Sequence, residues 1–268
     1  MASFCDIVAD ACPRSDVHRT LVFAREMAKS FSARLSVVSY AWPRIFLKDV
    51  LNSNAFRAQE QTALMERALA ASRSAFDKVF VDTRDEVDWC SGIAEPTMGM
   101  HARLLAADLL ITDSSEEEAY VLPNPAHVAL DSGIPVLRLG RQLASSDFPS
   151  VLVAWKDSSH ARRAVHDALP ILVHAKRVSV VGVGDEVSAD QLDAVATHLR
   201  RHKVKACHWH IPDTAGDVCS ELLAQAQHEA AKLIVTGVYS RGPMIERVLG
   251  GVTANMLKYA DISWFMAH

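Results

Sequence analysis

The residues with the clearest capacity for chemistry lie near the end of the chain, in the stretch GVYSRGPMIERVLGGV (237–252). It follows the apolar run KLIVT and precedes the helix-like run TANMLKYA. Gly250 and Gly251 would come just before that helix, where unpaired backbone N–H groups can approach an anion closely. Arg241 and Arg247 could add charge-assisted hydrogen bonds. This pattern is typical of a phosphate site.

The same glycines also have a purely structural interpretation. Gly237 and Gly250 could supply only the positive φ angles that turns require. The stretch is not a Walker A motif, because Pro243 stands where that motif requires lysine. A phosphate site and a simple turn therefore both remain open from these residues.

Four histidines form a second group of candidate residues, in THLRRHKVKACHWH. His198 and His202 are four residues apart on a predicted helix, so they share a face. His208 and His210 share one face of the following predicted strand, with Cys207 on the other. Four imidazoles could hold zinc or copper. The alternative is a helix end and an edge strand that carry solvated histidines.

Two candidate nucleophiles have simpler explanations. Ser158 and Ser159 precede His160, but no GxSxG elbow is present, and capping of a helix that begins there accounts for both serines. Cys12 lies beside Arg14 and could be a reactive thiol if basic neighbours lower its pKa. The alternative is a buried, inert cysteine.

An internal repeat decides how these residues are positioned. Four segments of the first half have counterparts in the second half, in the same order along the chain. The matched pairs are FCDIVAD with PSVLVAW, ARLSVVSY with KRVSVVGV, DLLIT with KLIVT, and GIPVLRL with DISWFMA. Short Val/Ile/Leu runs alternate with helical stretches in each half, which predicts parallel sheets with helices on both faces.

The repeat predicts an α/β protein of two tandem domains, each with a five-stranded parallel sheet. The break falls in GRQLASSDFPS (140–150), a polar stretch with Gly, Ser and Pro. We therefore expect domains over 1–140 and 149–268. The first half carries an extra segment, 45–79, with helical spacing of its apolar residues. This long amphipathic helix could cover its own sheet, or it could lie over the second domain or a partner chain.

Composition limits the class of protein. The chain has 268 residues, half of them apolar, and a formal charge of -4, which argues against a nucleic-acid binder. The sequence contains no run of eighteen apolar residues, so a membrane span is not expected. The first residues do not have the pattern of a signal peptide. The five scattered cysteines are expected to be reduced thiols. A cytoplasmic protein is the expectation.

Together these features resemble a tandem universal stress protein. The resemblance rests on VLVAWKDSSHARRAVHDAL (151–169), on AAKLIVTG, on GVYSRGPMIERVLGGVT, and on the final helix and strand, so it covers nearly the whole chain. It implies a Rossmann-like (adenine nucleotide alpha hydrolase-like) fold, ATP binding in some members, and pairing through the last strand. It also implies a role in stress survival rather than one shared reaction.

The resemblance also implies which residues would contact a nucleotide. In the family loop, Gly237 takes the first glycine, Ser240 stands at the second, and Gly250 takes the third. Gly251 replaces a hydroxyl residue, and Lys156 stands where the family has an acidic residue. The implied nucleotide-binding set is Ala154, Trp155, Lys156, Asp157, Ser158, Val183, Gly237, Ser240, Arg241, Gly242, Gly250, Gly251, Val252 and Thr253.

The first half is not expected to bind phosphate. Its corresponding loop, DSSEEEAYVLPNPAHV, has no glycine, and Glu116, Glu117 and Glu118 would repel a triphosphate. The predicted protein is thus a stress-response regulatory or scaffolding protein whose second half binds ATP, ADP or AMP.

Two alternatives remain, an interaction module with a vestigial loop and a metal protein that uses the histidines. We expect the two halves to pair within the chain and two chains to form a homodimer. Neither a nucleic acid nor a membrane is expected as a partner. Efficient turnover is not expected, since no placed general base or carboxylate pair is identifiable.

Overall fold

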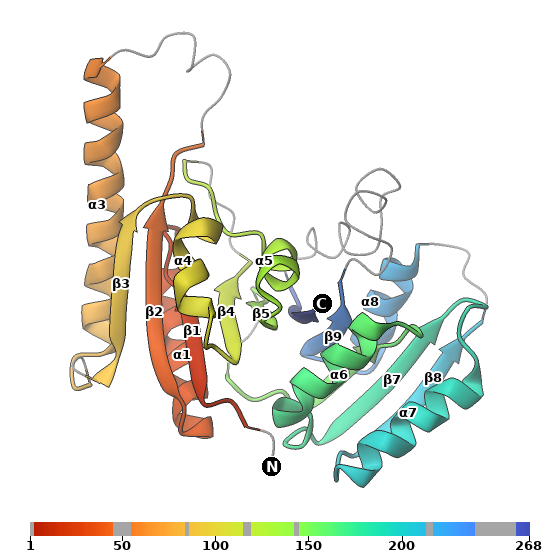
Figure 1. The fold of residues 1–268 in the computed structure, drawn as a ribbon. Coiled ribbons are helices and arrows are strands. Elements are labelled where there is room, and N and C mark those ends of the chain that lie inside the picture. Colours follow the sequence, from red (N-terminus) through yellow and green to blue (C-terminus); the bar gives the residue numbers. More distant parts are fainter. Residues whose placement is uncertain are drawn as a thin grey trace. The chain divides into compact units, whose positions relative to one another are not determined.

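The computed structural model describes residues 3–44, 55–83, 86–114, 119–141, 145–212, 217–238 and 261–268 (Figure 1). The chain forms two compact units, Phe4–Asn124 and a second unit that includes Pro125–His268. The break predicted from sequence lies further along, at 140–150. The units divide earlier because the last helix and strand of the first repeat pack with the second unit. The domain boundaries 1–140 and 149–268 stay a prediction.

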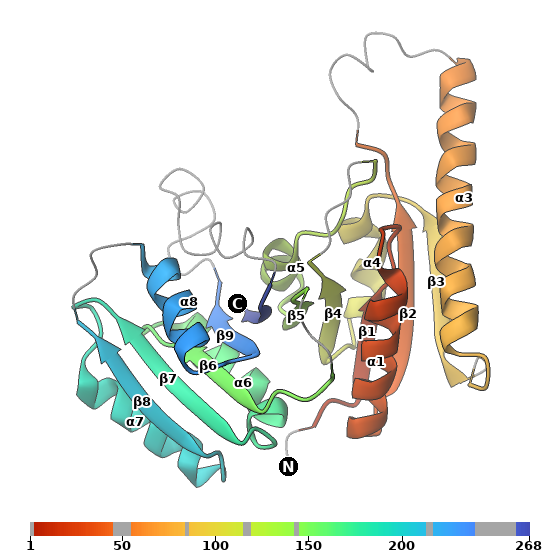
Figure 2. The same ribbon diagram turned by 180° about the vertical axis from the view of Figure 1, so that it is seen from behind.

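The first unit is a parallel α/β sheet in the order β3-β2-β1-β4. Helices α1 and α3 cover one face of it and α4 the other (Figures 1 and 2). Strands β1 and β4 are almost completely buried, as expected for central strands covered on both faces. Its elements are β1 (Asp6–Asp10), α1 (Val17–Phe31), β2 (Arg34–Ala41), α3 (Ala55–Val79), β3 (Asp88–Ile93), α4 (Pro96–Leu104) and β4 (Leu109–Asp113).

Helix α3 confirms the long helix predicted within 45–79, of which residues 45–54 lie outside the described part. It packs against α1, β2 and β3 of its own unit. Met65, Phe76 and Val79 are buried at helical spacing, and the Phe76 ring lies 4.9 Å from that of Trp89 on β3. Among the interpretations left open by the sequence, α3 thus fits the one in which the helix covers its own sheet.

The second unit is a larger sheet in the order β5-β10-β9-β6-β7-β8. All of its strand pairs are parallel except β5 with β10. Helices α6 and α7 lie on one face and α8 on the other (Figures 1 and 2). Its elements are α5 (Pro125–Ser132), β5 (Val136–Leu139), β6 (Ser150–Ala154), α6 (Ser159–Leu172), β7 (Arg177–Val183), α7 (Ala189–Arg201), β8 (Ala206–Ile211), α8 (Val218–His228), β9 (Leu233–Gly237) and β10 (Ser263–Ala267).

The internal repeat is confirmed strand by strand. The four matched sequence pairs form β1 and β6, β2 and β7, β4 and β9, and β5 and β10. The order β3-β2-β1-β4 recurs as β8-β7-β6-β9. The last strands of the two repeats pair antiparallel, with Leu137 opposite Phe265. The predicted pairing of the two halves within one chain therefore occurs through these strands.

Two simpler expectations, and the start of helix α7, can also be compared with the structure. All five cysteines are free thiols. In the part of the chain that the structure describes, no helix combines the length and apolar character needed to cross a bilayer. Helix α7 begins with a capping box between Ser188 and Gln191, which fixes its first turn.

Candidate functional site

The second unit has a topological switch point between β6 and β9. The chain crosses from β6 to β7 on one side, while β9 lies on the other side of β6. In open parallel sheets, ligands bind outside the carboxyl ends of the strands at such a point. Ala154 ends β6 and pairs in register with Thr236, which precedes Gly237 at the end of β9. Val183 ends the neighbouring β7. The structure thus places Ala154, Val183 and Gly237 at this edge.

Trp155 and Ser158 connect β6 to the start of α6 at this edge. The Trp155 backbone N–H donates to the Val181 carbonyl at 2.8 Å. Its indole Nε1 is buried, and no described residue accepts a hydrogen bond from it. Ser158 is the N-cap of α6 and accepts a hydrogen bond from Ala161 N at 3.1 Å. At this edge, the capped N-terminus of α6 thus follows Trp155, whose indole donor no described residue satisfies, and both features fit a polar or anionic ligand.

Lys156 occupies the position where the resembling family has an acidic residue. Its ammonium pairs with Glu186, and the next residue, Asp157, pairs with Arg162. All four side chains are more than 40% exposed, so each pair contributes little to stability. The carboxylate of Glu186 offsets the positive charge that Lys156 brings to this edge.

Gly237 has a structural role that sequence reasoning missed. A Cβ at this position would lie 2.6 Å from the carbonyl carbon of His160 and 2.7 Å from Ala161 N. The φ of Gly237 is not positive, so the interpretation of this glycine as a left-handed turn residue is wrong. The residue is glycine because the first turn of α6 sits directly on the end of β9.

His160 contacts another histidine from the end of the chain. The rings of His160 and His268 stack, with centroids 4.1 Å apart and planes at 22°. His268 Nδ1 donates to the Val238 carbonyl at 3.1 Å. Ser158 is committed to capping, as predicted, rather than to a Ser–His dyad. No local pattern could have revealed the pair, because the two histidines are joined only by the closeness of α6 and β10.

The remaining predicted loop residues lie outside the described part of the chain. They are Ser240, Arg241, Gly242, Gly250, Gly251, Val252 and Thr253. Their roles stay predictions.

The corresponding edge of the first unit is filled by its own side chains. Asp10, at the end of β1, and Arg14 have almost completely buried side chains and form an ion pair. Arg14 also donates to the Cys12 carbonyl at 3.1 Å, and Thr112 Oγ1 donates to Asp10 Oδ2 at 2.7 Å. Burial alone would lower the pKa of Arg14, but the adjacent Asp10 carboxylate holds it above its ordinary value. A permanently charged guanidinium therefore occupies the switch point between β1 and β4.

Cys12 is not a reactive thiol. Burial raises its pKa well above the ordinary value, and Asp10 raises it further, whereas Arg14 lowers it only in part. The thiol accepts a hydrogen bond from Tyr40 N at 3.3 Å. The sequence-based alternative of a thiol activated by Arg14 is wrong because the ion pair of Arg14 with Asp10 brings an anion to the same place.

The four histidines of the second group do not converge. His198 and His202 share a face of α7, as predicted, with ring centroids 4.8 Å apart. His208 instead lies 3.6 Å from Asp193 Oδ1, and His210 Nε2 donates to the Gly184 carbonyl at 3.3 Å. No group of three or more metal-ligating side chains gathers within the described residues. The four-histidine metal site is therefore wrong.

His198 nevertheless has a property that can be measured. Burial lowers its pKa, and the neighbouring His202, His166 and Arg201 lower it further. The unfolded chain, with an ordinary pKa of 6.5, binds this proton more readily than the folded protein. Stability rises with pH wherever the unfolded state binds more protons. The contribution of His198 to the stability of the folded protein is thus complete above the ordinary pKa. It is lost as the pH falls through the lowered pKa of the folded state.

We expect the substitution His198→Gln to flatten this acid-side loss of stability. Urea unfolding at several pH values between about 5 and 8 would measure it. His18→Gln removes an exposed histidine of α1 and is the matched control, which should keep the slope of the parent protein. An unchanged slope in His198→Gln would contradict the assignment.

The strand orders define a class: doubly wound, Rossmann-like α/β proteins with two tandem repeats. Within that class, the chain has the fold of the universal stress proteins. A universal stress protein from Archaeoglobus fulgidus DSM 4304 matches with a TM-score of 0.70 and 14% identity, over 97% of this chain and 95% of that one. A putative universal stress protein from Pseudomonas aeruginosa UCBPP-PA14 matches with a TM-score of 0.60 and 14% identity, over 98% and 93%.

These likenesses span nearly the whole of both chains, and at this level of identity they show the fold. The predicted tandem universal stress protein fold is confirmed. No known protein-family model matches the sequence, and no curated protein matches it.

Proposed function

We propose that this protein is a cytoplasmic stress-response protein of the universal stress type that binds an adenine nucleotide in its second half. One observation carries the proposal: the start of α6 sits directly on Gly237 at the β6/β9 switch point. This packing brings a helix N-terminus and the unpartnered Trp155 indole to the edge where α/β sheets bind ligands. The glycine loop begins at the same residue. ATP, ADP or AMP would lie here, with its phosphates toward Gly250 and Gly251.

Each chain would bind a single nucleotide. In the first half, the Arg14 guanidinium and the Asp10 carboxylate already fill the corresponding crevice. The first half would then serve as the pairing partner of the second, and two chains would associate as a homodimer. Its activity would be nucleotide-responsive regulation or scaffolding rather than turnover.

A second candidate is an interaction module with a vestigial loop. The ion pair between Lys156 and Glu186 favours it, because a lysine stands in place of the family's acidic residue and is already neutralised. This candidate predicts a stable oligomer with no response to nucleotides.

A nucleotide panel distinguishes the two candidates. We expect saturating ATP, ADP or AMP to raise the melting temperature by a few degrees, since a ligand that binds only the folded state stabilises it. Gly250→Asp should remove this shift, because a carboxylate there would repel phosphate. Ser145→Asp adds the same charge at an exposed position between β5 and β6 and should leave the shift intact. No shift with any nucleotide, together with a defined oligomer in light scattering, would favour the interaction module.

A further inference from the structure

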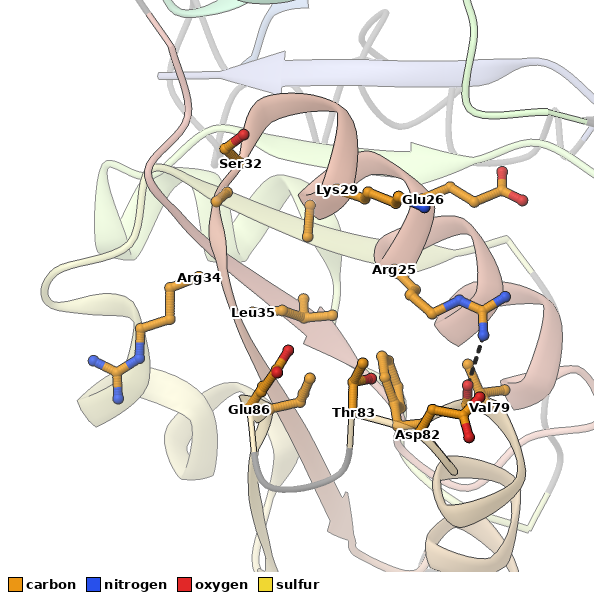
Figure 3. Close-up of a pocket in the computed structure, with 14 residues that line it drawn as sticks. Arg25, Glu26, Lys29, Ser32, Arg34, Leu35, Val79, Asp82, Thr83 and Glu86 are labelled. Atoms are coloured by element: carbon orange, nitrogen blue, oxygen red, sulfur yellow. Dashed lines mark hydrogen bonds between the residues drawn. The ribbon is translucent and has the colours of Figure 1, made fainter.

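A cavity of about 730 Å³ lies in the first unit, at the edge of the sheet where β2 begins. This is the amino end of the strand, opposite the edge that carries the ion pair of Asp10. The last turns of α1, the end of α3 and the described residues that follow α3 line it (Figure 3). Small-molecule sites have volumes of roughly 300–1,000 Å³. The cavity therefore has the size of a site for a metabolite.

The floor of the cavity is apolar. Leu35 at the start of β2, Val79 at the end of α3 and Phe80 just after it all line the cavity. Each is at least 95% buried, so the floor is a fixed part of the core rather than a mobile surface. A ligand with an apolar body would gain about 25 cal/mol for each Å² that it buries here.

Charges of opposite sign that pair with no described residue stand on opposite walls of the cavity. Lys29 and Ser32 belong to the α1 wall, whereas Asp82 and Glu86 belong to the segment after α3, with Leu35 between them in Figure 3. Lys29, Asp82 and Glu86 make no ion pair or side-chain hydrogen bond with any described residue. Glu26, three residues before Lys29 on α1, is a further carboxylate that pairs with no described residue.

The two arginines of the cavity, in contrast, each have a hydrogen-bond partner. Arg25 donates to the Val79 carbonyl at 2.7 Å, and Arg34 donates to Asp88 Oδ2 at 2.5 Å. Lys29 and Glu26 on the α1 wall, and Asp82 and Glu86 across from them, are thus the charged groups of the lining that have no partner among the described residues.

We propose that this cavity binds a small zwitterion with an apolar body, of the amino-acid or dipeptide class. Its carboxylate would accept charge-assisted hydrogen bonds from Lys29 and Ser32. Its ammonium would donate to Asp82 and Glu86, and its side chain would cover the apolar floor. A ligand with only one charge would satisfy one wall and leave the other to water, so both ends contribute to recognition.

The test uses glycyl-leucine and two blocked forms, N-acetyl-glycyl-leucine and glycyl-leucinamide, with calorimetry on the full chain. Glycyl-leucine should bind saturably, and each blocked form about tenfold more weakly, because each loses one charge-assisted contact. Lys29→Gln should abolish the difference between the free carboxylate and its amide. Asp82→Asn combined with Glu86→Gln should abolish the difference between the free amine and its acetyl form.

All of these positions are exposed, so the variants should fold normally. Glu26→Gln removes an unpaired carboxylate from the α1 wall, on the carboxylate side of the ligand, and is the matched control. It should not weaken binding of glycyl-leucine. Absence of saturable binding, equal binding of the three compounds, or equal affinity of all variants would each overturn the proposal. The nucleotide-dependent melting shift belongs to the other half and is expected to be unaffected.

Discussion

Replacing Arg14 with methionine is expected to lower the free energy of unfolding by about 3–5 kcal/mol. The side chains of Arg14 and Asp10 are 1% and 0% exposed, so neither can turn to water when its partner is removed. Methionine keeps much of the volume but none of the charge. Among the described residues, Thr112 Oγ1 and Cys12 N would still donate hydrogen bonds to the Asp10 carboxylate. Equilibrium unfolding in guanidinium chloride at neutral pH measures the loss.

The matched control is Arg162→Met. Arg162 also pairs with an aspartate, Asp157, but both side chains are about half exposed. Its loss should cost less than about 1 kcal/mol. Combining Arg14→Met with Asp10→Asn should recover part of the stability, because no uncompensated buried charge then remains. If Arg14→Met were as mild as Arg162→Met, the buried ion pair would not be what occupies this crevice.

The fold was predictable because its central strands carry their signal locally. The segments that form β4 and β9, DLLIT and KLIVT, are continuous apolar runs, which is the pattern of parallel strands buried on both faces. The matched segments follow the same order in both halves, and this common order identified the repeat. Strand β3 was not recognised, because an edge strand with partly exposed residues carries a weaker pattern. The division of the compact units before α5 has no local sequence signal, since it depends on the pairing of β5 with β10.

The candidate sites were harder to predict because they depend on contacts between distant segments. In the first half, the sequence argued against phosphate binding from Glu116, Glu117 and Glu118, which lie outside the described residues. The structure adds a separate argument, a buried network in which Arg14 meets Thr112 across 98 positions of sequence. No spacing rule anticipates that contact.

The histidines illustrate the opposite error. Helical spacing correctly placed His198 and His202 on one face, but it could not show which neighbour that face meets. On that face, the His198 ring meets the ring of His166 of α6, with ring centroids 5.5 Å apart. Periodicity predicts which residues share a face, whereas the neighbour of that face is set by packing.

Replacing Gly237 with alanine is expected to lower the free energy of unfolding by about 3 kcal/mol, the upper end for overpacking a core. The added Cβ would lie within 2.7 Å of two backbone atoms of α6, which cannot move aside as a flexible side chain could. Gly92→Ala, in β3, is the matched control. A Cβ there would lie 3.6 Å from the Tyr40 ring, an ordinary contact, so stability should barely change.

This substitution separates two roles that a loop glycine can have. A glycine that serves only the ligand can be replaced without loss of stability in the nucleotide-free protein, and the loss then appears as weaker nucleotide binding. If a glycine instead allows α6 to pack against β9, its replacement lowers the stability of the protein with or without nucleotide. The contacts of Gly237 predict the second result, so thermal unfolding without nucleotide should already show it. An unchanged melting temperature in Gly237→Ala would mean that α6 can move away from β9 at little cost, and the packing argument for the site would fail.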